Sequence, residues 1–243
     1  MKILVIGDSC TDIFIYGEID RVCPEAPVPV FKPIHQKQNG GMVKNVKSNL
    51  EALGCEVDII TNPNDIKKTR YIDDKSNQMV MRVDEHDSCE RVNRYFLDFD
   101  EDKYDAIVIS DYCKGFLTEE DIEYLCNHKN VFIDTKKKLG DWVKDADFIK
   151  INHLEHQKNF EIIPNYPELE NKLIVTQGKK GCIYKGKIFL TEEVPVKDVS
   201  GAGDTFLAGL VFKYIETKDI EKSIDFAQEC TTKVVQKHGV STI

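Results

Sequence analysis

Short apolar segments of strand length alternate along this chain with longer segments whose apolar residues recur at helical spacing. The strand-like segments cover residues 2–7, 57–61, 106–110, 131–134, 148–151 and 173–176. Helical spacing predicts helices at 42–53, 118–127 and 219–237, and the last of these is expected to be the longest. Strands that alternate with helices predict an α/β fold with a parallel sheet covered by helices on both faces. Ligands of such a fold bind at the carboxyl ends of the strands.

Two stretches, 13–38 and 69–83, depart from that alternation. Polar and apolar residues alternate in both, and the first is rich in proline. We therefore expect antiparallel strands outside the main sheet, which would form a small lid over its edge. The 243 residues contain no internal repeat and no Gly/Ser-rich linker, so we expect a single domain spanning residues 1–243, with the lid as its only subdomain.

Composition narrows the possible functions. The hydrophobic fraction of 41% and the charged fraction of 31% are typical of a globular protein, and the net charge of −9 disfavours nucleic-acid binding through a broad basic face. No apolar run is long enough to span a membrane, and Asp8 and Asp12 interrupt the N-terminal run that would otherwise suggest a signal peptide. The eight cysteines occur singly, without a CxxC pair, so we expect free thiols in a reducing cytoplasm and no zinc site.

The segment DVSGAGDTF, at residues 198–206, carries the strongest chemical signal. Its glycines permit unusual backbone angles, and the amides of Gly201, Ala202 and Gly203 would point toward one anion at a helix N-terminus. Asp204 beside that anion is suited to accept a proton from an attacking hydroxyl. On these residues alone, a tight turn with an acid in the first turn of a helix is an equal alternative. The chain has no GxxxxGK[ST] segment, and no GxGxxG follows its first strand.

The same segment is similar to the C-terminal signature D-[TV]-[ST]-G-A-G-D-[TS]-F of the ribokinase family, the phosphofructokinase-B type sugar kinases. Further stretches resemble motifs of that family in the same order: GDSCTD at 7–12, Gly40-Gly41 followed by Asn45, NHLE at 152–155 and VTQGKKG at 175–181. Within the family, the heptose-7-phosphate kinase branch is the most similar. That likeness rests on YGEIDRVCPEAPVPVFK at 16–32, KTRYIDDKSNQMVMRVDEHD at 68–87, SDYCKG at 110–115 and the ending HGVSTI.

The resemblance implies a ribokinase-like three-layer α/β/α fold with a mostly parallel central sheet and a small β-strand lid. It implies an ATP- and Mg²⁺-dependent kinase that phosphorylates the anomeric hydroxyl of a sugar phosphate. In this branch the sugar phosphate is D-glycero-D-manno-heptose 7-phosphate, used in nucleotide-heptose synthesis. Asp204 would be the general base, and the amides of Gly201, Ala202 and Gly203 would hold the phosphoryl group, whose transfer needs positioning and charge neutralisation.

The resemblance assigns the remaining site residues as well. Asn152 and Glu155 would hold Mg²⁺ through water, because Mg²⁺ favours oxygen ligands and retains waters. Lys114 and Arg82 are candidates to bind the sugar phosphate, since an anionic substrate needs local cations on an acidic protein. The nucleotide would contact Asn152, Thr176, Gly178 and Gly181, and the sugar would contact Asp12, Gly40, Gly41 and Asn45.

Most of these assignments have a purely structural alternative. Asn152 with Glu155 is also the pattern of a helix cap, and residues 176–181 are also the pattern of a hairpin turn. Gly40-Gly41 is compatible with a plain strand-to-helix turn, and single lysines and arginines are most often solvated surface charges. For Trp142, packing is favoured over a role as a cofactor platform.

The chain is shorter than its relatives in two places. Only NPNDIK separates Thr61 from Lys68, where relatives have a further helix and strand, and the stretch between Glu155 and Leu173 is also short. We expect one α/β layer to be missing at the sheet edge, which leaves that edge exposed or covered by a partner. The helix after Gly41 begins MVKNV where the branch has AANVA. Two alternatives therefore stay open: a kinase of another sugar or nucleoside, and a non-catalytic sugar- or nucleotide-binding module.

As partners we expect the sugar phosphate and ATP, and neither nucleic acid nor membrane. Lid strands of this family commonly pair between subunits, which implies a homodimer through the lid. The chain ends soon after its last predicted helix, so we expect a separate protein to supply the nucleotidyltransferase of the next pathway step.

Overall fold

Eight strands form the main sheet of the computed structural model, which describes residues 1–237 and 239–243. Their order is β12-β11-β10-β9-β8-β7-β1-β4. Six strands pair in parallel, and each lies within one residue of its predicted position: β1 (Lys2–Gly7), β4 (Glu56–Thr61), β7 (Ala106–Asp111), β8 (Val131–Thr135), β9 (Phe148–Asn152) and β10 (Leu173–Thr176). The short β11 (Cys182–Tyr184) and β12 (Lys187–Phe189) add an antiparallel edge. His238, the first residue of the HGVSTI ending, lies outside the described residues.

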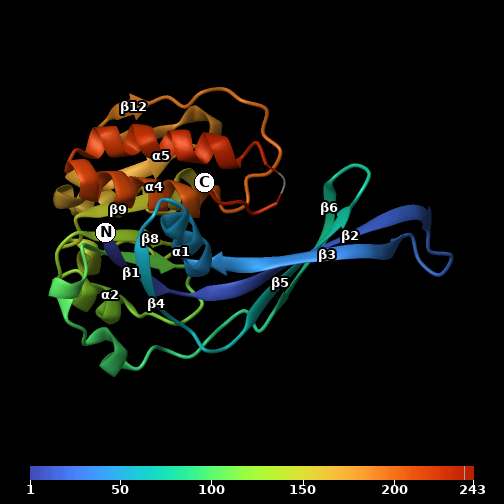
Figure 1. Cartoon of the computed structure of the whole chain (residues 1–243), viewed down its shortest axis with the longest axis horizontal. Coiled ribbons are helices and arrows are strands. Elements are labelled where there is room, and N and C mark those ends of the chain that lie inside the picture. Colours follow the sequence, from blue (N-terminus) through green and yellow to red (C-terminus); the bar gives the residue numbers. More distant parts are fainter. Residues whose placement is uncertain (238) are drawn as a thin grey trace.

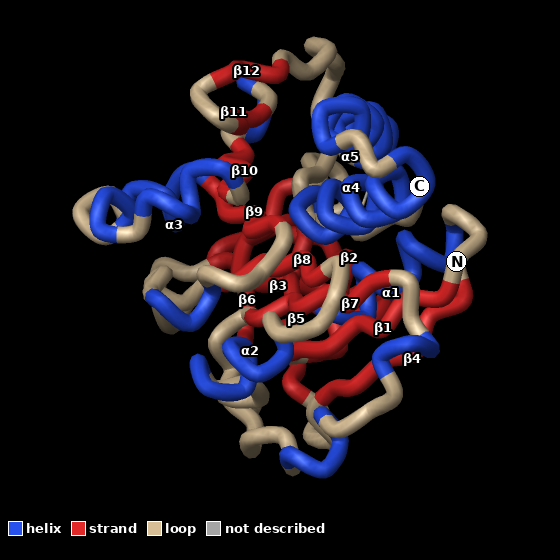
Figure 2. The backbone as a smooth tube through the Cα atoms, turned by 90° about the vertical axis from the view of Figure 1, so that its left-hand side faces the viewer, coloured by secondary structure: helices blue, strands red, loops and turns tan. Residues whose placement is uncertain are grey.

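Helices cover both faces of this sheet, as the alternating pattern predicts (Figure 2). α1 (Val43–Ala52), α4 (Ala202–Thr217) and α5 (Ile220–Val234) lie on one face, and α2 (Glu119–Leu125) and α3 (His153–Lys158) lie on the other. No helix in the described part of the chain is long and apolar enough to cross a membrane. Short 3-10 turns occupy Arg94–Leu97, Glu101–Lys103, Asp141–Val143, Ile163–Asn165, Pro167–Asn171 and Gly178–Lys180.

The expectation that the last helix is the longest is wrong. α4 has 16 residues and α5 has 15. Eight consecutive residues of α4, from Asp204 to Val211, are buried, because this helix lies between the sheet and α5. A helix that is buried on all sides lacks the one-sided apolar spacing that marks α5, so its length is hidden in the sequence.

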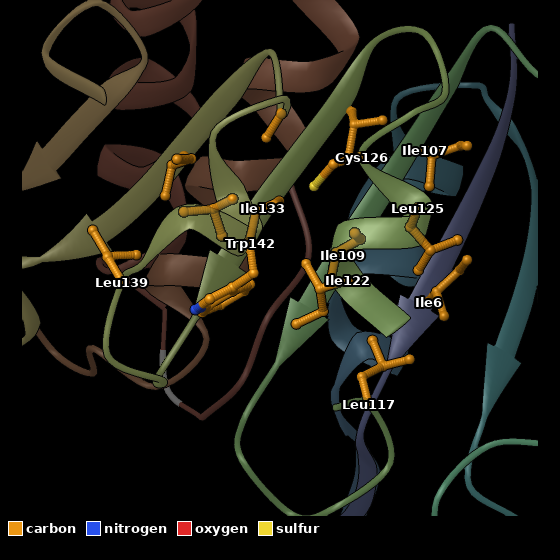
Figure 3. Packing of buried hydrophobic residues seen from close by; sticks show 14 of the residues in the cluster. Ile6, Ile107, Ile109, Leu117, Ile122, Leu125, Cys126, Ile133, Leu139 and Trp142 are labelled. Carbon is orange, nitrogen blue, oxygen red and sulfur yellow. The ribbon is translucent and has the colours of Figure 1, made fainter. Parts of the chain in front are cut away.

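Two apolar clusters fill the layers on either side of the sheet. The cluster in Figure 3 joins the strands to α2, and Trp142 packs within it, 8% exposed, as expected. The opposite cluster joins the strands to the other three helices through side chains such as Val46, Phe206 and Ile224. Because neighbouring side chains of a strand point to opposite faces, the near-continuous apolar runs in the sequence supply both clusters. The eight cysteines are free thiols, as their single spacing predicts.

Four further strands form a second sheet, the lid, which extends away from the body of the molecule (Figure 1). β2 (Ser9–Val22) and β3 (Pro29–Met42) make one antiparallel hairpin, and β5 (Ile66–Asp73) and β6 (Gln78–Glu85) make another. At the centre of the lid, β2 and β5 pair in parallel, which differs from the expectation of antiparallel strands throughout. Alternation shows that a segment is a half-buried strand but does not show which neighbour it pairs with.

β4 is the outermost strand of the main sheet, at the place where the chain is shorter than its relatives. Only residues 62–65 separate it from β5. Charged side chains line this edge: Lys2 pairs with Glu56, and Asp58 lies 3.5 Å from Lys2 and 3.4 Å from Lys103. Charges of this kind discourage pairing with another strand, so the β4 edge is protected by ion pairs.

Candidate active site

Most of the residues predicted for the two substrates line two adjoining cavities at the carboxyl ends of the parallel strands, whereas Gly40, Gly41 and Asn152 line neither of them. The first cavity, of about 330 Å³, is lined by Asp12, Asn45, Arg82, Lys114, Gly201 and Asp204, together with Cys10, Met42, Lys68, Arg70, Tyr112, Ser200 and Val240. The second, of about 110 Å³, is lined by Thr176, Gly178, Gly181, Thr191, Ala202, Gly203, Phe206, Gln228 and Thr231. Residues 201–203, which we call the signature turn, contribute to both cavities, so the predicted phosphoryl-binding turn stands between the sugar-side and nucleotide-side groups.

Asp204 is held in the first turn of α4 and is 3% exposed. Asn45 Nδ2 donates a hydrogen bond to one carboxylate oxygen at 2.8 Å, and Tyr112 Oη donates to the other at 2.7 Å. Burial raises the pKa of Asp204 to about 6, and the hydrogen bonds from Asn45 and Tyr112 oppose that rise. A carboxylate with a pKa near the working pH is well suited to accept a proton from a hydroxyl.

This pKa predicts how the activity depends on pH. Because Asp204 accepts a proton only when it is ionised, kcat/KM should fall about tenfold per pH unit below pH 6 and level off above it. Tyr112→Phe removes a hydrogen bond that lowers the pKa of Asp204, so the acid limb should move to higher pH in that variant. Steady-state rates between pH 5 and 8 test both expectations. If the acid limb of Tyr112→Phe lies at the same pH as that of the wild type, Asp204 is not the group that titrates.

The signature turn places its glycines where side chains cannot fit. Gly201 is the N-cap of α4 with φ of +77°, and a Cβ there would lie 2.4 Å from Asn45 Nδ2. The amide of Ala202 donates to the carbonyl of Val199 at 3.2 Å. Of the three amides expected to face an anion, this one is therefore engaged within the turn, because the chain closes on itself as α4 begins.

The lid and the loop after β7 bring four cations to the first cavity. Lys68 lies 3.1 Å from Asp84 and 2.9 Å from Asp87, and Asp87 also accepts from Lys114 at 2.6 Å. Arg82 pairs with Asp84 at 2.9 Å. Lys114 and Arg82 were predicted from the sequence, whereas Lys68 and Arg70 were missed. Lys68 and Arg70 are two residues apart in β5, so their side chains lie on the same face of the strand and line the cavity. This i, i+2 spacing of two cations in the KTR segment is the sequence signal that could have identified them.

Asn45 has a different contact from the one expected. Its amide donates to Asp204 and approaches the carbonyl of Gly201 at 3.5 Å, while its carbonyl oxygen accepts from Asn49 at 3.2 Å. The helix α1 starts directly after Met42, and its first turn faces the N-terminus of α4, so the amide meets the carboxylate. In this structure Asn45 positions Asp204, and its side chain also lines the first cavity.

Asp12 and Gly41 contact one another across the hairpin of β2 and β3. Asp12 is 6% exposed and accepts a hydrogen bond from Arg70 on β5. A Cβ on Gly41 would lie 2.1 Å from Asp12 Oδ2, a separation that no side chain tolerates. Gly41 is therefore required by the close approach of Asp12, whereas a Cβ on Gly40 would meet only the side chain of Lys44.

This contact predicts the effect of Gly41→Ala. The added methyl group should push Asp12 out of place and raise KM for the sugar about tenfold, which corresponds to about 1.4 kcal/mol of lost binding. If the effect passes through Asp12, the double variant Gly41→Ala/Asp12→Ala should bind no more weakly than Asp12→Ala alone. Additive losses in that cycle would show that Gly41 acts independently of Asp12.

Asn152 and Glu155 form the capping box of α3. The Asn152 side-chain oxygen accepts from the amides of Leu154 and Glu155, and Glu155 accepts from the Asn152 amide at 2.7 Å. Glu155 also pairs with Lys136 at 2.5 Å. The alternative of a helix cap therefore describes how both side chains are used here, and Asn152 offers no free oxygen.

The second cavity brings the VTQGKKG residues together with the turn and with α5. Gly181 has φ of +85°, and a Cβ there would lie 1.9 Å from the carbonyl oxygen of Phe189, so the chain reverses tightly between β10 and β11. Gln228, on α5, is 7% exposed, and its buried side-chain oxygen has no hydrogen-bond partner among the residues that the structure describes. Gln228 was missed in the sequence because it lies within the spacing of an ordinary amphipathic helix.

Asp8 was also missed as a site residue, although its side chain organises the loop that follows β7. It is fully buried and accepts from the amides of Tyr112 at 2.7 Å, Lys114 at 3.3 Å and Phe116 at 3.3 Å. Burial, together with the nearby Asp111, raises the pKa of Asp8. The loop that carries Tyr112 and Lys114 into the first cavity is thus fixed to the end of β1.

Comparisons with known proteins agree with this geometry. Residues 108–243 match the family described as pfkB family carbohydrate kinase. The chain is 30% identical over 292 residues to the bifunctional protein HldE of a Nitratiruptor species, covering 99% of this chain and 63% of that protein. It is 30% identical over 293 residues to the HldE protein of Helicobacter pylori, covering 98% and 63%. The chain thus spans less than two thirds of these relatives, and both alignments are longer than the chain.

Solved structures show the same fold at low sequence identity. A ribokinase from Thermotoga maritima superposes with a TM-score of 0.73 at 17% identity, covering 98% of this chain and 94% of that one. Arabidopsis thaliana ribokinase, solved with ribose and ATP, has a TM-score of 0.65 at 14% identity, covering 98% and 93%. The expected ribokinase-like three-layer fold is confirmed. The chain belongs to the pfkB carbohydrate kinase family and is a sugar kinase, a phosphotransferase of a family that uses ATP.

Proposed function

We propose that this chain transfers the γ-phosphoryl group of ATP to the anomeric hydroxyl of D-glycero-D-manno-heptose 7-phosphate, giving the 1,7-bisphosphate and ADP. The observation that carries this proposal is the first cavity, in which Asp204 shares one space with four cations, Lys68, Arg70, Arg82 and Lys114. A phosphorylated sugar needs a base for its hydroxyl and cations for its phosphate. The heptose is supported by the likeness of 16–32 and 68–87 to heptose-7-phosphate kinases.

In this reaction Asp204 accepts the proton of the anomeric hydroxyl as the sugar oxygen bonds to the γ-phosphorus. The bond between that phosphorus and the β–γ bridging oxygen breaks, and ADP leaves with the electron pair. The signature turn would hold the phosphoryl group, with the Gly201 and Gly203 amides facing it and the Ala202 amide released from Val199 when the anion enters. Asp12, held by Arg70, would bind sugar hydroxyls beside Asn45 and the Gly40-Gly41 backbone.

Mg²⁺ would neutralise charge on the nucleotide phosphates when bound. We propose that the ion is held through water, as Mg²⁺ retains part of its hydration shell in proteins. Glu155 fits this role, and so does Asp134. The buried Oδ1 of Asp134 has no hydrogen-bond partner among the described residues, and Lys136 Nζ lies 3.8 Å from it. Asn152 would act by fixing Glu155 through the helix cap.

ATP would occupy the second cavity, against Thr176, Gly178 and Gly181. The buried, unpartnered oxygen of Gln228 would accept a hydrogen bond from an amino group of the base. Because this cavity draws on α4 and α5 while the sugar-side cavity draws on the lid, we propose that residues 1–243 act as one domain with the lid as a part of its site.

A coupled ADP-release assay tests the proposed function. Mg-ATP is supplied with D-glycero-D-manno-heptose 7-phosphate, other heptose 7-phosphates, hexose phosphates, free sugars and nucleosides. Turnover should be highest with the heptose 7-phosphate, and Arg82→Ala should raise KM for a phosphorylated sugar but leave ATP binding unchanged. Turnover restricted to a free sugar or nucleoside would refute the substrate. Binding of ATP or sugar without turnover of any member of the panel would favour a non-catalytic binding module.

We further propose that the protein forms a homodimer through the lid. Exposed large apolar side chains concentrate there, at Val22, Val28, Ile34, Met79, Val80, Met81 and Val83. Apolar surface of this kind marks an interaction site. Light scattering should report a dimer that Met81→Lys converts to a monomer, and a wild-type monomer at micromolar concentration would contradict it. The anomeric phosphate made by the reaction would then be the substrate of a nucleotidyltransferase.

A further inference from the structure

A lysine buried beneath the signature turn is not used by the function proposed above. Lys150 lies in β9 and is 3% exposed. Its Nζ donates to Asp134 Oδ2 at 2.6 Å, and the two residues are register partners on adjacent strands. Their neighbours along the strands, Ile133, Ile149 and Ile151, belong to the cluster that packs against α2. Because neighbouring side chains of a strand point to opposite faces, Lys150 and Asp134 point to the face that carries α4.

The ammonium group of Lys150 lies directly against the signature turn. A Cβ placed on Gly203 would be 2.9 Å from Lys150 Nζ, so the absence of a side chain at Gly203 leaves room for this contact. An ammonium group has three donors, and Asp134 accepts from one of them. Lys150 itself lines neither cavity, but its ammonium group lies beneath Gly203, which lines the second cavity next to Gly201 of the first.

The charge balance around this lysine depends on several groups, since Lys136 lies 3.8 Å from Asp134 and pairs with Glu155. The N-terminus of α4 carries a partial positive charge, and burying an ammonium group beside it is costly without compensating negative charge. Asp134 and Asp204 supply that charge, and Lys150 in turn lowers the pKa of Asp204. When Asp204 accepts the proton of the substrate, the cluster loses one negative charge. An anionic phosphoryl group at the turn would restore the balance.

We propose that Lys150 is a catalytic residue that binds the transferred phosphoryl group from beneath residues 201–203, while Asp134 positions its ammonium group. This inference rests on the proposed function, because it requires the γ-phosphoryl group of ATP to lie at that turn. During in-line transfer, negative charge spreads over the three equatorial oxygens of the phosphoryl group. A fixed ammonium group at that point stabilises the transition state more than the ground state.

The test compares Lys150→Met with a matched control, Lys137→Met. Lys137 is also a largely buried lysine that pairs with a carboxylate, Asp111, at 2.8 Å, but its atoms are not among those found next to the glycines of the signature turn, whereas Lys150 Nζ is. Calorimetry with ATP and with adenosine measures phosphate binding without any sugar. Lys150→Met should weaken ATP binding at least tenfold, leave adenosine binding unchanged, and lower kcat by about 10²- to 10³-fold. Lys137→Met should bind both ligands as the wild type does.

A second variant, Lys150→Gln, keeps the test decisive if Lys150→Met does not fold. Its side-chain amide can still donate a hydrogen bond to Asp134, so the buried carboxylate is not left without a donor. Unchanged ATP affinity in the folded variant would overturn the proposal, and so would equal losses for ATP and adenosine, which indicate a structural role. Failure of the wild type to phosphorylate any sugar would refute the proposed function, whereas the ATP and adenosine measurements would still decide the role of Lys150.

Discussion

Asp204→Asn is expected to lower kcat by about 10²- to 10⁴-fold, the range that general base catalysis contributes. The side chain keeps its size, and Asn45 and Tyr112 still surround it, so the fold and the cavity should persist. The lost function is proton acceptance, since an amide at neutral pH cannot take the proton of a hydroxyl. KM for the sugar and the affinity for ATP should therefore change little. Coupled ADP release, with calorimetry for ATP, measures both quantities.

Asp141→Asn is the matched control for that variant. Asp141 lies in an exposed ion pair with Lys144, so its replacement should leave kcat unchanged. The pH profile adds a second criterion: residual activity in Asp204→Asn should lose the acid limb near pH 6. Wild-type turnover by Asp204→Asn, or an acid limb that survives the change, would exclude Asp204 as the base.

Asp8→Ala is expected to cost at least about 3 kcal/mol of the free energy of unfolding. The fully buried carboxylate accepts three backbone hydrogen bonds from Tyr112, Lys114 and Phe116. Each buried donor left without a partner costs about 1–3 kcal/mol. Because the freed loop carries Tyr112 and Lys114 into the first cavity, kcat/KM should fall as well. Denaturant unfolding at constant m-value measures the stability loss.

Two variants define the limits of this expectation. Asp8→Asn keeps one acceptor oxygen and should lose less stability than Asp8→Ala. Asp65→Ala removes an exposed carboxylate that accepts from Thr11 at 2.7 Å, and its effect should stay below about 1 kcal/mol. A loss of equal size in Asp8→Ala and Asp65→Ala would show that the loop does not depend on its anchor at Asp8.

The parallel strands and the signature turn could be located in the sequence because each depends on local pattern. A buried parallel strand is apolar on both faces, so each of the six shows as a short apolar run. The glycines of residues 201–203 are needed for backbone angles and close approach, which are properties of the segment itself. The length of α4 was hidden for the opposite reason, since a helix buried all round has no polar face to set its period.

Contacts between distant segments could not be read in the same way. Asn45 was assigned to the sugar, but α1 places its amide on Asp204, 159 residues away in the chain. Lys68 and Arg70 reach the first cavity only because β5 pairs in parallel with β2, which turns alternate side chains of both strands toward the body of the molecule. Asp8 gave no signal beyond a motif match, because its three partners are backbone amides more than a hundred residues away.

The sequence by itself determined the family and the order of strands and helices, and it pointed to Asp12, Glu155 and Asp204 as candidate site residues, because these depend on residue type and local spacing. The tertiary structure alone decided which of these residues share a cavity and what each side chain contacts. It showed Asn152 and Glu155 as a helix cap, Asn45 and Tyr112 as the partners of Asp204, and Lys150 beneath Gly203. The physical reason is that hydrogen bonds, burial and the resulting pKa shifts arise from approach in space, and spacing along the chain does not encode them.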